Sequence, residues 1–414
     1  MYEKAKKYLV GGVNAPIRAF PLIDIKPIYV KKSIGPYITD TEGRNYINFI
    51  SAWGSIILGD AYPEIVEELK ERLNEGIYSG LSNEYEYLLA EMIIEAYPYH
   101  QMLRFVNSGT EANTIALRLA RAITGRSKIV KFDGGYHGSI DYLLVENGSS
   151  EFGSQIASSS GVPKRLIKDT VSLPYNDVEV LEEFFSSYGK EIAAVIVEPI
   201  QTSNLLIKAD YKFLSKLKEL TKKYSCLLIF DEISTCFRED FYGLGREIKP
   251  DITVLGKVIG GGFPIGAVVS SKEYMEVMAP VGNMSHSGVF AGHPICVFAG
   301  YKVLSIIKKI PDFYQTLKSK IDFIVKHIDQ TELKINYTNS MFCIYFSEKK
   351  IESNEEIGNM DIMSFIDLYK SLISEGIVLS PNPLEPNYLN YSHTQNVVEY
   401  FVEKVNRSLS LIRR

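Results

Sequence analysis

Short apolar runs alternate with longer amphipathic segments through the middle of the chain. The runs are uniformly apolar instead of alternating, which predicts strands of a sheet that is buried on both faces. The expected strands span residues 102–106, 128–132, 193–197, 226–230, 252–255 and 265–269. The segments between them have helical periodicity, as at 63–73 and 211–223. This alternation predicts a doubly wound α/β domain with a mostly parallel sheet.

The two ends of the chain follow a different pattern. The first fifty residues predict short strands and turns, with candidate strands at 26–30 and 43–49. After about residue 310 the pattern indicates a helix, strands, a second helix, a short strand at 376–379 and a final helix from about 395. We therefore expect a large domain at 51–309. A smaller α+β domain would combine residues 1–50 with residues 310–414.

Composition narrows the class of protein. With 46% apolar residues, 23% charged residues and a net charge of −5, the 414-residue chain is typical of soluble globular proteins, and it gives no reason to expect a nucleic-acid partner. It has no apolar stretch long enough to span a membrane, and its polar beginning lacks the apolar core of a signal peptide. Four distant cysteines without a Cys-x-x-Cys motif fit reduced thiols in a cytoplasm. The histidines are few and unclustered, so no metal site is expected.

Lys257 stands at the end of an apolar run, just before the glycines at 260–262. Burying an ammonium is costly, but a desolvated amine can form a Schiff base with a carbonyl. Asp231 directly follows another apolar run. A Schiff-base lysine and a buried aspartate together meet the needs of pyridoxal 5'-phosphate, whose aldehyde the lysine holds and whose ring nitrogen the aspartate keeps protonated. Taken alone, Lys257 would be read as a surface lysine after a core strand, because most lysines are solvated.

A small polar turn, Ser108-Gly109-Thr110, lies between the first expected strand and a helix. Free backbone N–H groups at a helix N-terminus attract anions, and the two hydroxyls add further donors. The alternative is an ordinary N-cap. The position of the turn after a central strand favours ligand binding, because ligands of doubly wound domains bind at that edge of the sheet.

Two further loops follow expected strands. Tyr136 and His137 belong to a glycine-rich loop at 134–138, where an aromatic ring could stack on a flat heterocycle or pack on the core. Glu198 and Gln201 follow the strand at 193–197. Gln201 could donate to a ring oxygen of the cofactor and Glu198 could orient neighbouring groups, or the loop could satisfy only its own backbone.

These motifs, in this order along nearly the whole chain, resemble the class III pyridoxal-phosphate aminotransferases of fold type I. The resemblance is greatest to their glutamate-1-semialdehyde 2,1-aminomutase branch. The residues that carry it are 11–20, 51–54, 104–112, 136–138, 230–232, 255–262 and 392–394.

The resemblance implies a role for each matching residue. Lys257 would form the internal aldimine and then move protons, and Asp231 would pair with the pyridinium. The implied cofactor contacts are Ser108, Gly109, Thr110, Tyr136, His137, Glu198, Gln201 and Val289. The implied substrate contacts are Arg18, Trp53 and Glu385. The resemblance also implies a homodimer whose sites are built at the subunit interface.

Several positions depart from the aminomutase pattern. Ala15 replaces a serine, and Val289 replaces a threonine whose hydroxyl reaches the phosphate. The residues at 201–204 differ, and the Ser- and Gly-rich segment at 146–163 stands where that branch has a gating loop, so lid behaviour stays open.

Because the departures surround the substrate and phosphate positions, we favour an aminotransferase. It would move an amino group from a donor to a carbonyl acceptor through a Schiff base at Lys257. The aminomutase reaction is the alternative, a racemase shares the fold, and a non-catalytic scaffold is the remotest reading, because a scaffold needs neither Lys257 nor Asp231.

Overall fold

The computed structural model describes residues 1–147 and 155–412. The chain divides into two compact units. The larger is Glu68–Lys309, and the smaller joins Met1–Glu67 to Ile310–Arg414. Residues 51–67, which the sequence pattern assigned to the large domain, group with the smaller unit. The three-part division into folding domains stays a prediction.

The larger unit is built on a seven-stranded sheet in the order β4-β14-β13-β12-β9-β5-β8. Its strands are β4 (Met102–Val106), β5 (Lys128–Phe132), β8 (Thr170–Leu173), β9 (Ile192–Val197), β12 (Leu227–Asp231), β13 (Ile252–Gly256) and β14 (Gly266–Ser270). β14 runs antiparallel to its neighbours β4 and β13, and all other pairs of neighbouring strands are parallel. The mostly parallel sheet confirms the predicted fold class.

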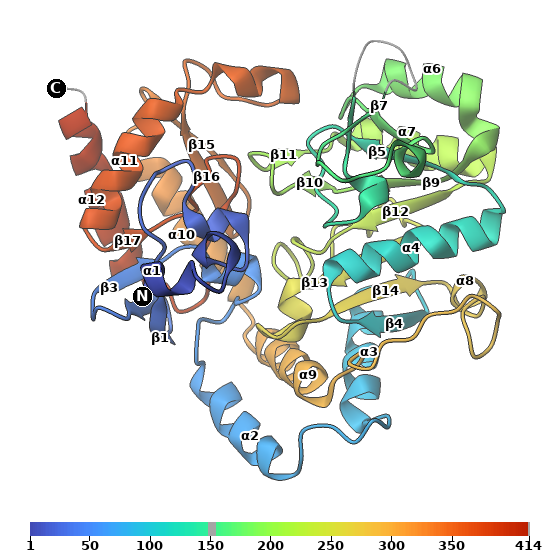
Figure 1. Ribbon diagram of the computed structural model, residues 1–414, viewed down its shortest axis with the longest axis horizontal. Helices are drawn as coiled ribbons and strands as arrows, with labels where there is room; N and C mark the ends of the chain where they lie inside the picture. Colours follow the sequence, from blue (N-terminus) through green and yellow to red (C-terminus); the bar gives the residue numbers. More distant parts are fainter. Residues whose placement is uncertain (148–154, 413–414) are drawn as a thin grey trace. The chain divides into compact units, whose positions relative to one another are not determined.

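Successive residues of the central strands enter two different cores. Ile229 belongs to a core on the side of helix α4 (Gly109–Thr124), whereas Leu228 and Phe230 belong to a core with α6 (Val178–Tyr188) and α7 (Tyr211–Tyr224). Figure 1 shows these helices on opposite sides of the sheet. Neighbouring side chains of a strand point to opposite faces, so a strand covered on both sides must be apolar throughout. This explains the uniform runs in the sequence.

The remaining elements of the larger unit are shorter or peripheral. The helices are α2 (Pro63–Asn74), which begins in the smaller unit, α3 (Glu84–Ala96), α5 (Lys164–Ile167), α8 (Lys272–Met275) and α9 (Pro294–Lys309). The minor strands are β6 (Val145–Asn147), β7 (Gln155–Ala157), β10 (Ile200–Gln201) and β11 (Ile207–Lys208). Part of the segment 146–163 lies outside the described residues, so no lid can be assigned to it.

The smaller unit combines both ends of the chain. Its strands are β1 (Val30–Ile34), β2 (Tyr37–Asp40), β3 (Asn45–Asn48), β15 (Leu333–Tyr337), β16 (Met341–Phe346), β17 (Ile377–Val378) and β18 (Asn387–Tyr388). Its helices are α1 (Tyr2–Ala5), α10 (Phe313–His327), α11 (Ile362–Ser374) and α12 (Gln395–Ile412). The C-terminal strand β17 pairs in parallel with the N-terminal strand β3. The strand expected at 26–30 was wrong, because β1 begins only at Val30.

Residues 51–67 group with the smaller unit because they bond to its C-terminal part. The Ser51 hydroxyl donates to the Tyr388 carbonyl over 3.0 Å, and the carbonyls of Ile57 and Leu58 accept from the backbone N–H groups of Tyr391 and Ser392. In residues 1–147 and 155–412, no helix has both the length and the apolar character needed to cross a membrane.

Candidate active site

Lys257 follows β13 directly and begins a short 3-10 helix, Lys257–Gly260. Its backbone adopts a left-handed conformation with φ 46°. This conformation costs a non-glycine residue about 1–2 kcal/mol and persists only where the surrounding structure imposes it. The side chain is half-buried, and its Nζ donates to the Ser234 hydroxyl over 2.7 Å. The amine is therefore held inside the larger unit instead of extending into solvent.

Asp231 ends β12, the strand beside β13, and its carboxylate is 4% exposed. Asn113 Nδ2 and His137 Nδ1 each donate to Asp231 Oδ2 over 2.8 Å, and the Ile233 backbone N–H donates to Oδ1 over 3.1 Å. Burial lowers the pKa of His137, against the opposing effect of the Asp231 charge. The carboxylate is thus fixed in place by three donors.

Glu198 lies after β9, the next strand of the sheet, and is also buried. Burial and then the nearby charge of Asp231 raise the pKa of Glu198 to about 8. Its Oε1 accepts from the Tyr136 backbone N–H over 2.9 Å, and its Oε2 accepts from the N–H and hydroxyl of Thr202, both over 3.2 Å. Glu198 therefore fixes the backbone of the loop that carries Tyr136, whose side chain is 57% exposed.

Gln201 bonds to the residue that precedes the same loop. Its Nε2 donates to the Asp133 carbonyl over 2.7 Å, and its Oε1 accepts from Asn204 Nδ2 over 2.8 Å. A primary amide carries two N–H donors. The predicted contact of Gln201 with a ring oxygen stays a prediction.

Ser108, Gly109 and Thr110 form the first turn of α4. Ser108 is the N-cap and accepts from the Glu111 N–H over 3.2 Å, and the Thr110 hydroxyl accepts from the Ser139 N–H over 3.3 Å. In the described part of the chain, the N–H groups of Gly109 and Thr110 have no acceptor. Such N–H groups at a helix N-terminus attract an anion.

Close packing holds the turn in place. A Cβ on Gly109 would lie 2.6 Å from Ile233 Cδ1, and a Cβ on Gly138 would lie 2.3 Å from Thr110 Oγ1. Both distances are too short for unbonded atoms, so a side chain at either position would displace Ile233 or Thr110. We call residues 107–111, which carry these N–H groups, the cradle.

The predicted residues of the larger unit thus gather at the ends of neighbouring strands. Val289 is 72% exposed, and its carbonyl accepts a hydrogen bond from the Tyr78 hydroxyl. Arg18, Trp53 and Glu385 belong to the smaller unit. There Arg18 is exposed, whereas Trp53 and Glu385 are half-buried.

Sequence reasoning missed two residues of this site. Asn113 anchors Asp231, and Ser234 holds the Lys257 amine. Asn113 left a usable signal, because it is polar in the otherwise apolar buried stretch of α4. Ser234 left none beyond its position three residues after Asp231.

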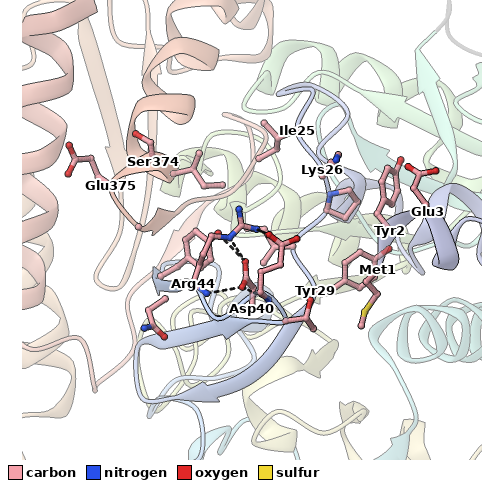
Figure 2. Close-up of a pocket in the computed structure, with 18 residues that line it drawn as sticks. Met1, Tyr2, Glu3, Ile25, Lys26, Tyr29, Asp40, Arg44, Ser374 and Glu375 are labelled. Atoms are coloured by element: carbon pink, nitrogen blue, oxygen red, sulfur yellow. Dashed lines mark hydrogen bonds and ion pairs between the residues drawn. The ribbon is translucent and has the colours of Figure 1, made fainter.

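A cavity of the smaller unit is separate from these residues. It measures about 900 Å³, lies within the smaller unit, and is lined by α1, the β2–β3 hairpin and the end of α11. Figure 2 shows its central ion pair, in which Arg44 Nε donates to Asp40 Oδ2 over 2.7 Å. Asp40 also accepts from the backbone N–H groups of Glu42 and Arg44. Its buried carboxylate is already satisfied, and no predicted site residue lines the cavity, so the cavity is not the candidate active site.

Comparison with known proteins places these observations in a family. The family model for class-III aminotransferases matches residues 23–341. The glutamate-1-semialdehyde 2,1-aminomutase of Thermosipho africanus is 41% identical over 99% of each chain. An omega-transaminase from Sphaerobacter thermophilus has a TM-score of 0.90 at 29% identity, covering 100% of this chain and 97% of its own. A transaminase solved with PLP bound has a TM-score of 0.87 at 25% identity, covering 99% of this chain and 96% of its own.

Proposed function

The chain belongs to the class-III aminotransferases, enzymes that depend on pyridoxal 5'-phosphate, and from this premise we propose that it transfers an amino group between two separate small molecules. The observation that carries the proposal is the pairing of Lys257, bonded to Ser234, with Asp231, bonded to His137 and Asn113. The two groups follow adjacent strands, so both reach the same edge of the sheet.

The described residues fit this cofactor at each of its polar ends. The unpaired N–H groups at Gly109 and Thr110 suit the phosphate, and the Asp231 carboxylate suits a protonated ring nitrogen. The Lys257 amine suits the aldehyde, and the exposed ring of Tyr136 is free to stack on a flat heterocycle. When bound, pyridoxal phosphate withdraws electrons from the carbon that carries the substrate amine, so that its proton can leave.

The chain's own residues would then do the following. Asp231 would keep the proton on the ring nitrogen, because its carboxylate is buried and fixed by donors on its other sides. Lys257 Nζ, once replaced by the substrate amine, would carry the proton between the two carbons that exchange it. The Ser234 hydroxyl would hold that amine nearby, and Glu198 and Gln201 would fix the loop beneath Tyr136. Arg18, Trp53 and Glu385 stay proposed substrate contacts on the strength of the resemblance alone.

A second candidate function is the aminomutase reaction, in which one molecule gives up and regains the amino group. The name of the relative from Thermosipho africanus, at 41% identity over nearly the full length, favours it. The replacements at Ala15 and Val289 favour the transferase.

A trapping experiment tests the site. Borohydride reduction of the protein with its cofactor should fix the cofactor to Lys257, as shown by mass spectrometry of peptides. Lys131 is a matched control, because it too is buried, with its Nζ donating to the carbonyls of Leu143 and Val145. Labelling at Lys131, or no labelling at all, would contradict the proposal.

A turnover experiment tests the reaction. The protein should convert amino donors only when a separate carbonyl acceptor is present. Chromatography of both products measures this conversion. Conversion of glutamate 1-semialdehyde alone to 5-aminolevulinate at a useful rate would favour the aminomutase instead.

We also propose that the protein is a homodimer and works in the cytoplasm. Ile77, Leu81, Val289 and Phe290 are 59–75% exposed, and Tyr78 joins the two segments through the Val289 carbonyl, so they offer an apolar surface for a second copy. The four cysteines are unpaired, as in a reducing compartment. Light scattering and cell fractionation test the two statements.

A further inference from the structure

His286 lies in the loop that leads to Val289, and it is bonded to the helix that carries the anion cradle. Its Nε2 donates to Glu111 Oε1 over 3.1 Å. Its side chain is 5% exposed, and its Nδ1 is buried without a partner in the described part of the chain. Burying a nitrogen without a partner costs free energy. The hydrogen bond of Nε2 to Glu111 is therefore the contact that offsets the burial of this ring.

Glu111 uses its other carboxylate oxygen to shape the cradle. Oε2 accepts from the backbone N–H of Asn107 over 2.7 Å and from Asn107 Nδ2 over 3.0 Å. The Glu111 N–H in turn donates to the Ser108 hydroxyl. These bonds close a ring around residues 107–111, so the direction of the N–H groups at Gly109 and Thr110 depends on where the Glu111 carboxylate stands.

The loop before Val289 is attached to α4 at more than one point. Arg118 Nη1 donates to the Ser285 carbonyl over 3.0 Å. A Cβ on Gly288 would lie 3.3 Å from Asn107 Nδ2 and 3.5 Å from Glu111 Oε1. The loop is thus seated on the cradle, and His286 is the side chain that contacts the carboxylate at its centre.

We propose that His286 is a positioning residue for the cofactor phosphate, acting through Glu111 on the turn at 107–111. This inference rests on the proposed function, because it assigns the cradle to the phosphate. It predicts that a change at His286 weakens the grip on the phosphate and leaves the covalent link at Lys257 intact.

The test compares two substitutions of similar size. In His286→Gln the amide nitrogen takes the place of Nε2 and keeps a donor for Glu111, whereas in His286→Asn it takes the place of Nδ1 and the donor is lost. Dissociation constants are measured by visible absorbance for apoprotein titrated with pyridoxal phosphate and with pyridoxal, which lacks the phosphate. The dissociation constant for pyridoxal, divided by that for pyridoxal phosphate, reports on the phosphate alone.

We expect His286→Asn to reduce that ratio about tenfold or more, as for a lost hydrogen bond to a charged group, with pyridoxal binding unchanged. His286→Gln should restore most of the ratio. An equal loss of affinity for both ligands would mean that His286 has a general structural role. Unchanged affinities for both would mean that His286 has no role in phosphate binding. Either result overturns the inference. If wild-type protein binds neither ligand, the proposed function itself fails.

Discussion

Gly138 offers the sharpest test of the cradle, because its lack of a side chain is required for contact with Thr110. The residue has φ +87°, and a Cβ there would lie 2.3 Å from Thr110 Oγ1 and 3.0 Å from Thr110 Cα. Gly161 is a matched control, since it has φ +89° and nothing within 4 Å of an added Cβ. Alanine substitution at the two positions therefore differs only in the steric contact.

The expected magnitudes follow from these geometries. An alanine in the left-handed region costs about 1–2 kcal/mol in the folded state, partly offset by about 0.5–1 kcal/mol from a less flexible unfolded chain. Gly161→Ala should therefore lower the free energy of unfolding by about 1 kcal/mol. Gly138→Ala should lose a further 1–3 kcal/mol, roughly the cost of overpacking.

The assay is urea unfolding of both apoproteins, together with titration of each with pyridoxal phosphate. The displaced Thr110 should weaken cofactor binding in Gly138→Ala, whereas Gly161→Ala should bind as the wild type does. Equal losses of stability in the two variants would refute the steric argument. Unchanged cofactor binding in Gly138→Ala would refute the assignment of Thr110 to the phosphate.

Three further predictions each concern a single residue. Asn113→Ala removes the donor to Asp231 and should lower the free energy of unfolding by about 1.5–3 kcal/mol in urea; a loss below about 0.5 kcal/mol contradicts the anchor role. Because the pKa of Glu198 rises from 4.5 unfolded to about 8 folded, the folded state holds an extra proton between these values. Glu198 should therefore lower apoprotein stability as pH rises through this window, by up to about 1.4 kcal/mol per unit, and Glu198→Gln should remove this contribution. Ala52 is exposed and has φ 50°, so Ala52→Gly should raise the free energy of unfolding in urea by about 0 to 1 kcal/mol. Ala122→Gly, on the exposed face of α4, should lower it by about 1 kcal/mol. Equal losses in the two variants would show that Ala52 is unstrained.

The apolar runs predicted most of the sheet, because burial on both faces leaves a signal that needs no knowledge of partners. The runs at 102–106 and 128–132 coincide with β4 and β5. The strand β8 was missed, since Thr170 and Ser172 interrupt its apolar character. Ser172 is nevertheless buried, and its hydroxyl donates to Asp133 Oδ1. Ser172 thus has a partner for its hydroxyl, whereas Thr170 Oγ1 is buried with none in the described part of the chain, and neither case can be read from the run itself.

The candidate site divides in the same way. Lys257 and Asp231 could be predicted because each directly follows an apolar strand, and strand ends meet at one edge of a parallel sheet. Asn113 bonds to Asp231 across 118 positions of sequence, so its role depends on the packing of α4 against the sheet. The cradle could be predicted only in part. Its N-cap, Ser108, was evident from the sequence, whereas the bond between His286 and Glu111 joins residues 175 positions apart.

Backbone strain adds an argument that neither motifs nor burial supply. Left-handed backbone occurs at Lys257 and at Ser51, Ala52 and Trp53 in succession, with φ values of 44–57°. Strain of about 1 kcal/mol or more at each residue persists only where the surroundings impose it. For residues 51–53 those surroundings are visible, since Asn390 Nδ2 donates to the Ser51 hydroxyl over 3.1 Å and a Cβ on Gly54 would lie 2.5 Å from the Tyr388 ring. Lys257 and Trp53, which the sequence singled out for their chemistry, share this conformation with residues that no motif assigns to the site, such as Leu205 and Ser225. Left-handed backbone marks places where the surroundings impose a conformation, and these include buried core residues such as Leu205, so the roles proposed for Lys257 and Trp53 depend on their chemistry.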